Sequence, residues 1–292
     1  MPTAGELLRL WRGERRISQL ELALRAGSSA RHLSFVETGR ARPGEDLLAR
    51  LAEQLDLPIR ERNTLFVAAG YAPVYPQTPL DAEEMAALGE TLAGLLRAHE
   101  PHPALVVDGA YDVVAANRGV RFLLGELPPE LATAPLNAIR LTLHPRGLAP
   151  RIRNLPEWRA HFLHRVERHL SLGAHPRLRA VYEEVLRYPV PGAEEGWEAP
   201  GPRAPQARAP YPYALPLRIE AGGRELTFLS TATTFNTPLD VTVSELAVET
   251  FLPADRRTAE ALREALGPAW PDWERDPLHP AAPDGVPGED GG

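Results

Sequence analysis

The sequence predicts a multidomain chain, with an all-helical domain followed by an α+β domain that has an antiparallel sheet and flanking helices. Five short helical patterns, each with its own start signal, follow one another over residues 1–73. Between residues 101 and 266, two strand patterns come first, then helical patterns, then three further strand patterns. No run of 18 apolar residues occurs in the 292 residues, so we expect no membrane-spanning helix.

Residues typical of helix caps separate the five N-terminal helices. Glu21 follows Ser18 by three residues, as in a capping box. Gly27 and Gly39 follow the second and third helices, where a left-handed residue can reverse the chain. The expected start residues are Thr3, Ser18, Ser28 or Ser29, Gly44 and Pro58.

The second and third helices have the spacing of a helix-turn-helix. Small Ala23 suits a close helix crossing, Gly27 suits the tight turn, and Leu33 and Val36 can pack the third helix. On this motif, and on Gly39-Arg40-x-Arg42-Pro43 after it, residues 5–72 resemble the Xre and phage-repressor family. The resemblance implies a five-helix, lambda-repressor-like domain that binds specific sequences of double-stranded DNA. Because one such module reads only a few base pairs, we expect a homodimer on a palindromic site.

The resemblance also assigns DNA contacts by position in the motif. Arg31 is the first choice for reading a base, because a guanidinium bonds guanine through two atoms at once. Arg40 and Arg42 are expected to neutralise phosphates, and Phe35 either contacts a thymine methyl group or belongs to the core. Glu37 is expected to hold the helices together, because DNA phosphates repel a carboxylate. The predicted contact residues are Gln19, Ser29, Ala30, Arg31, His32, Ser34, Phe35, Arg40 and Arg42.

The composition agrees with a basic N-terminal module on an acidic chain. All 32 basic residues are Arg, and there is no Cys, which excludes disulfides, thiolate nucleophiles, Schiff-base lysines and P-loop lysines. Residues 1–42 hold eight Arg against four Glu, whereas residues 243–292 hold eleven acidic residues against four Arg. A basic segment on a chain of net charge −7 is typical of a small DNA-binding module joined to a larger domain.

The middle of the chain is expected to connect the two domains. Residues 74–79 read as a linker, and Leu80 to His99 as a helix, so residues 74–100 form the connecting segment. Two further segments, a Pro-rich insertion over 189–212 and an acidic tail over 267–292, are rich in Pro and Gly and are predicted to be disordered.

The second domain is expected over residues 101–266. Gly222-Gly223 marks the turn of a hairpin, Asn117 is expected to cap one helix, and Asp255 the last one. The predicted strands are 104–108, 111–116, 213–219, 224–234 and 240–252, and the predicted helices are 117–124, 156–172, 176–186 and one after 255.

Short motifs in this domain resemble the MmyB-like ligand-binding domain of Xre-type regulators. They are Pro103-Ala104-Leu105-Val106-Val107-Asp108, Val113-Val114-Ala115-Ala116-Asn117, Asn154-Leu155-x-Glu157-Trp158, Leu226 to Thr231 and Asp240 to Leu246. The resemblance implies a PAS-like domain with a pocket for a small apolar molecule, such as a fatty acid, whose binding modulates DNA binding. The family commonly has Trp where this chain has Ala116, which leaves room in the core or implies a different ligand.

Apolar residues on these elements are the candidates for lining that pocket, although any of them can equally fill the core. They are Val106, Val113, Phe122, Leu123, Trp158, Phe162, Phe228, Thr231 and Phe235. A fatty carboxylate requires a cation nearby, and the sequence leaves four choices open: Arg140, Arg151, Arg153 and Arg165.

Two other classes of protein are alternatives on the sequence alone. The second domain could only dimerise or bind a protein partner, as in antitoxins. An enzyme is the weakest class, because no catalytic motif or phosphate loop occurs and His161 and His164 lack a third clustered metal ligand. We therefore expect no required cofactor and no metal. The charged N-terminus has no apolar signal-peptide core, so we expect a cytoplasmic protein that does not bind membranes.

Overall fold

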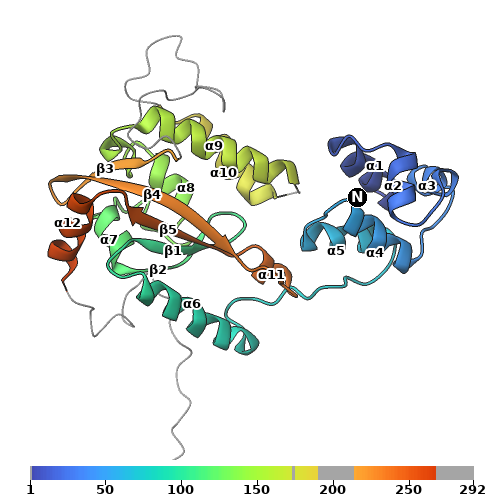
Figure 1. Cartoon of the computed structure of the whole chain (residues 1–292), viewed down its shortest axis with the longest axis horizontal. Coiled ribbons are helices and arrows are strands. Elements are labelled where there is room, and N and C mark those ends of the chain that lie inside the picture. The colour runs from blue at the N-terminus through green and yellow to red at the C-terminus, as the bar shows by residue number, and fades with distance from the viewer. Residues whose placement is uncertain (1, 173–174, 190–213, 268–292) are drawn as a thin grey trace, which may run out of the picture. The chain divides into compact units, whose positions relative to one another are not determined.

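The computed structural model describes residues 2–172, 175–189 and 214–267 (Figure 1). The chain divides into two compact units, one built mainly from Met1–Pro79 together with Asn236–Ser244, the other from Leu80–Arg168 and most of the remaining residues. Nearly all of the predicted insertion and tail lie outside the described residues. The domain boundaries drawn from the sequence stay a prediction.

The first unit contains the five predicted helices. They are α1 (Ala4–Glu14), α2 (Gln19–Arg25), α3 (Ala30–Glu37), α4 (Glu45–Gln54) and α5 (Ile59–Ala68). The side chains of Thr3, Ser18 and Ser29 each accept a hydrogen bond from a backbone N–H in the first turn of the helix that follows. Gly27 and Gly39 have φ angles of 63° and 72°, in the left-handed region where glycine is favoured.

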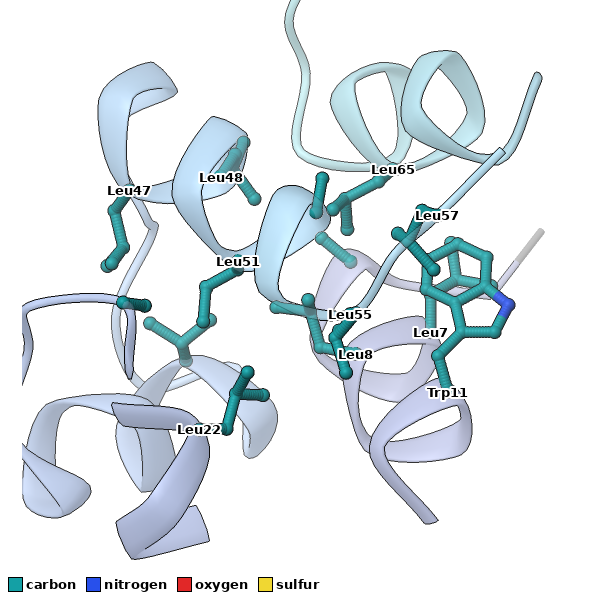
Figure 2. Packing of buried hydrophobic residues seen from close by; sticks show 14 of the residues in the cluster. Leu7, Leu8, Trp11, Leu22, Leu47, Leu48, Leu51, Leu55, Leu57 and Leu65 are labelled. Carbon is teal, nitrogen blue, oxygen red and sulfur yellow. The ribbon is translucent and has the colours of Figure 1, made fainter. Parts of the chain in front are cut away.

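Leucine side chains from all five helices meet in one core (Figure 2). Leu8, Leu22, Leu48 and Leu51 are fully buried there, with Trp11 at one side. Each buried leucine contributes about 1.5–3 kcal/mol relative to an exposed one, so this core accounts for most of the stability of so small a module.

Helix α1 also crosses the end of α3 at very close range. A Cβ atom at Gly5 would lie 2.4 Å from the carbonyl oxygen of Val36 and 2.9 Å from that of Glu37. No side chain fits at that distance, so the crossing requires glycine. This role of Gly5 was not predicted from the sequence.

The second unit is built on a five-stranded antiparallel sheet. Its strands are β1 (Ala104–Val107), β2 (Val113–Ala116), β3 (Leu217–Ala221), β4 (Arg224–Thr234) and β5 (Ala247–Pro253), in the order β2-β1-β5-β4-β3. The strand that is last in the chain therefore lies in the middle of the sheet. The predicted fold class, a PAS-like antiparallel sheet with flanking helices, is confirmed.

Helices cover both faces of this sheet (Figure 1). Leu92 and Leu96 of α6 (Ala86–Ala98) pack against Val106 and Val248 on one face. The other helices of the unit are α7 (Arg118–Leu124), α8 (Ala138–Leu143), α9 (Leu155–Leu172), α10 (Pro176–Leu186) and α12 (Arg256–Leu266), with short 3-10 turns at Glu83–Met85 and Ala149–Arg151.

Predictions about four of these elements are wrong. The strand predicted over 213–219 begins only at Leu217, and the helix predicted over 80–99 begins only at Ala86, after the 3-10 turn. The strand predicted over 240–252 begins only at Ala247, because the Asp240 carboxylate accepts hydrogen bonds from the backbone of Thr242 and Val243 and starts a short helix, α11 (Val241–Ser244). Helix α8 was missed, although Asn137 caps it by accepting two backbone hydrogen bonds. Within the part of the chain that is described, no helix is both long and apolar enough to cross a membrane.

We expect Gly5→Ala to destabilise the first unit by about 1–3 kcal/mol, because the new methyl group overlaps backbone that cannot move without separating α1 from α3. Gly13→Ala, in the same helix, is the control: nothing lies within 4 Å of its Cβ position, so we expect a gain of about 0.5–1 kcal/mol. Hydrogen exchange of the α1 and α3 amides in the full chain measures both. Equal protection in the two variants would contradict the close crossing.

Candidate DNA-contacting helix and apolar cavity

A buried carboxylate holds α3 against the two helices before it. The Glu37 side chain, 1% exposed, accepts hydrogen bonds from Arg12 Nε at 2.7 Å and from Gln19 Nε2 at 2.7 Å. Burial by itself would raise the pKa of Glu37, but the bonds from Arg12 and Gln19 outweigh it and hold that pKa below its ordinary value. The expectation that Glu37 joins the helices is therefore confirmed.

The opposite side of α3 is open to solvent. Arg31 and Arg40 are exposed, and the guanidinium of Arg31 lies 5.5 Å from the centre of the Phe35 ring. Phe35 is half-buried, so it is neither fully in the core nor fully available to a thymine methyl group. Two exposed cations, Arg31 on α3 and Arg40 three residues after its end, can meet phosphates and base edges.

Three of the predicted DNA contacts also have structural partners. Gln19 donates to Glu37, and Ser29 caps α3 by accepting from the backbone of His32. Arg42 donates to the carbonyl oxygens of Ala69 and Gly70 at the end of α5. Ala30, His32 and Ser34 are partly exposed on α3. The assignment of all nine residues to DNA contacts stays a prediction.

The second unit encloses an apolar cavity of about 70 Å³ on the face of the sheet opposite α6. Its walls come from β1 and β2, from α7, α8 and α9, and from β3, β4 and β5. Alternation along the strands decides which residues face it: Leu105, Glu249 and Phe251 line the cavity, whereas Val106 and Val248 pack towards α6.

Four of the nine predicted pocket residues line this cavity, namely Val113, Leu123, Trp158 and Phe162. Ala116, where the family commonly has Trp, lines it too. The structure places the other five elsewhere: Val106 packs against α6, Phe122 against Gly222, Phe228 against Phe251, Thr231 bonds Thr250, and Phe235 is 36% exposed beyond the end of β4.

Arg165 is the one of the four predicted cations that reaches the cavity. Arg140 pairs with Glu184 at 2.8 Å, Arg151 donates to the carbonyl oxygen of Leu124, and Arg153 pairs with Glu220. Arg165 lies over the rings of Phe162 and Tyr111, at 4.8 Å and 5.5 Å from their centres. Two aromatic faces thus hold its guanidinium group.

Arg165 already has a carboxylate partner that the sequence analysis missed. Its Nη2 atom donates to Glu249 Oε1 at 2.6 Å, and the side chains are 31% and 8% exposed respectively. Burial raises the pKa of Glu249, and Arg165 opposes that shift only in part. The signal for Glu249 was present in the sequence, as the single charge within the apolar strand Ala247–Pro253.

Two residues that line the cavity, one of them Arg165 itself, carry a buried donor that has no partner in the part of the chain that the structure describes. Within the described chain, Trp158 Nε1 and Arg165 Nε are buried and have no hydrogen-bond acceptor. Burial, with the nearby charge of Arg165, lowers the pKa of His161, so its ring is mostly neutral at neutral pH. Unsatisfied buried donors are costly, and in a cavity they indicate where a ligand oxygen can bind.

Metal binding has no geometric support in the described residues, among which no three His, Asp or Glu side chains cluster as a metal site. His161 faces the cavity, whereas His164 lies 3.9 Å from Glu167.

A helix-turn-helix module and a PAS-like sheet with an apolar cavity define a DNA-binding transcription regulator with a ligand-binding domain. Comparison with protein families supports this class. Residues 88–265 match the "MmyB-like transcription regulator ligand binding domain", and residues 8–62 match "Helix-turn-helix". The chain belongs to the MmyB-like family, whose model covers more than half of it.

Other comparisons add little. No curated protein sequence matches the chain. Among solved structures, "Structure of an RNA-binding Light-Oxygen-Voltage Receptor" is 12% identical, with a TM-score of 0.24. The alignment covers 90% of this chain and 60% of that one, and at so low a score it carries no argument about fold or function.

We expect Glu37→Gln to lower the free energy of unfolding of the first unit by about 1–3 kcal/mol at neutral pH, because Arg12 loses a buried counter-charge. Since the pKa of Glu37 in the folded protein lies below 4.5, this stabilisation is present above pH 4.5 and is lost as the pH falls through the lower, folded value. The difference between variant and wild type should therefore shrink in acid.

Glu21→Gln is the matched control. Glu21 pairs with Arg25 on the same helix, but both side chains are about half exposed, so we expect a change of less than about 0.5 kcal/mol. Hydrogen exchange of the α1 and α3 amides in the full chain, at several pH values, measures both variants. A pH-independent loss in Glu37→Gln would contradict the role of the ionised carboxylate.

Proposed function

We propose that this protein is a ligand-responsive regulator of transcription, in which occupancy of the cavity changes the affinity of the helix-turn-helix for DNA. The observation that carries the proposal is the apolar cavity with a polar end, in the same chain as a helix-turn-helix that exposes Arg31 on the recognition helix α3 and Arg40 just after that helix. A homodimer on a palindromic operator is part of the proposal.

The proposed ligand is a small, largely apolar molecule, and the family resemblance implies a fatty acid as the candidate. Apolar contacts come from Leu105, Leu123 and Phe251, and Arg165 lies at the polar end of the cavity. An engineered cavity of about 150 Å³ holds benzene. A cavity of about 70 Å³ is about half that size, so an acyl chain enters only if the lining side chains move apart.

We expect Arg31→Ala to lose about 1–3 kcal/mol on its preferred sequence and to relax the preference at one base pair, because the guanidinium would read a base edge. Arg40→Ala is the matched control: it should weaken binding to all sequences alike and reduce the salt slope by about one unit. Selection from a random duplex pool, followed by anisotropy titrations, measures both. An unchanged base-pair preference in Arg31→Ala would contradict the assignment of Arg31 as the residue that reads a base.

We expect the purified wild-type protein to retain a small molecule, or to take up an added lipid, when examined by native mass spectrometry. Ala116→Leu should abolish this binding, because the larger side chain fills the cavity. Ala87→Leu, on an exposed position of α6, adds the same volume away from the cavity and should bind as wild type does. Added ligand should change the DNA affinity of wild type and of Ala87→Leu, and it should leave that of Ala116→Leu unchanged.

Two results would count against the proposal. If wild type retains nothing and takes up no lipid, the cavity is not a binding site. If it binds a ligand but its affinity for DNA is the same with and without it, the second unit serves another purpose, such as the dimerisation or partner binding considered for antitoxin-like regulators.

A further inference from the structure

The polar end of the cavity carries one positive and one negative charge, already bound to each other. Glu249 lies opposite Leu105 of β1 and Ala232 of β4 in the sheet, and neither carries a charge. The titratable groups that face it are Arg165 and His161 of α9 and Tyr111 before β2, of which only Arg165 is charged at neutral pH. With Glu249 ionised in its bond to Arg165, the pair is neutral as a whole.

A carboxylate ligand would disturb this balance. It would place a second negative charge beside the single guanidinium of Arg165, in a site where Glu249 is 8% exposed. Two carboxylates that share one buried site cannot both remain ionised at low cost, so one of them takes a proton. An anion consequently binds here only with a proton, which either the ligand or Glu249 carries.

A neutral head group has matching partners in the same place. Trp158 Nε1 and Arg165 Nε are buried donors without acceptors on residues that line the cavity, and a carbonyl oxygen on the ligand can accept from either of them. The Glu249 carboxylate is an acceptor that lines the cavity and can receive an N–H or O–H from the ligand. The site thus offers both donors and an acceptor.

We propose that Glu249 makes the cavity select an apolar ligand whose head group is neutral and both donates and accepts hydrogen bonds, such as a primary amide or a protonated carboxylic acid, over a carboxylate anion. This inference rests on the proposed ligand binding in the cavity and goes further, since it names the chemistry of the head group and the residue that selects it.

The experiment compares octanamide with octanoate, two probes of equal chain length, by calorimetric titration of the full-length protein at neutral pH. Octanamide should bind wild type at least about tenfold more tightly, a difference of about 1.4 kcal/mol. In Glu249→Gln the competing charge is gone while the hydrogen-bonding shape remains. Octanoate should then bind about tenfold more tightly than it does to wild type, whereas octanamide should change by less than about threefold.

Glu225→Gln is the control for net charge. Glu225 pairs with Arg218 on the exposed side of β3 and β4, so this variant loses the same charge away from the cavity and should keep the wild-type preference. An equal gain in octanoate affinity in Glu225→Gln would show a general charge effect and overturn the assignment.

A second measurement needs no variant, and so it decides the question even if Glu249→Gln does not fold. Titrations of wild type in two buffers of different ionisation enthalpy should show an uptake of about one proton with octanoate and about none with octanamide. Binding of octanoate without proton uptake, or selectivity unchanged in a folded Glu249→Gln, overturns the role of Glu249 and leaves the proposed function standing. Absence of binding by either probe, together with no retained ligand, contradicts the proposed function itself.

Discussion

Strand β5 is the element on which the second unit depends. It pairs with β1 on one side and with β4 on the other, and so it joins two hairpins that lie about a hundred residues apart in the chain. Its residues also face both layers: Val248 packs towards α6, whereas Glu249 and Phe251 line the cavity. Because side chains alternate along a strand, a shift of one residue in its register would remove both of them from the cavity.

Stability alone does not explain the charged pair in that cavity. Burial removes hydration from Arg165 and Glu249, and well-packed apolar residues of similar volume stabilise a core at least as well as a buried ion pair does. Two donors of residues that line the cavity, one of them on Arg165 itself, are also left without acceptors in the described structure. Since groups that cost stability cluster where a protein binds other molecules, the pair supports the proposed ligand binding.

Local features of the fold could be predicted from the sequence, because their causes lie within a few residues. Ser18 and Ser29 cap their helices, and Gly222-Gly223 turns the late hairpin, as their residue types indicate. The prediction of a strand from Asp240 onward was wrong. Asp240 caps a short helix by accepting hydrogen bonds from the backbone of Thr242 and Val243, and these bonds are visible only in the structure. Gly5 was missed because its neighbour is α3, thirty residues away.

The cavity could be predicted less well, because its residues are selected by which face of the sheet they occupy. All four residues of β1 are buried, since helices cover both faces, so the strand has no polar alternation that distinguishes Leu105 from Val106. Glu249 is different. A single carboxylate within a buried strand requires a partner wherever the strand lies, so its presence indicates a buried cation or a polar site before either is located. In a chain whose basic residues are all Arg, that partner had to be an arginine or a histidine, and the fold selects Arg165.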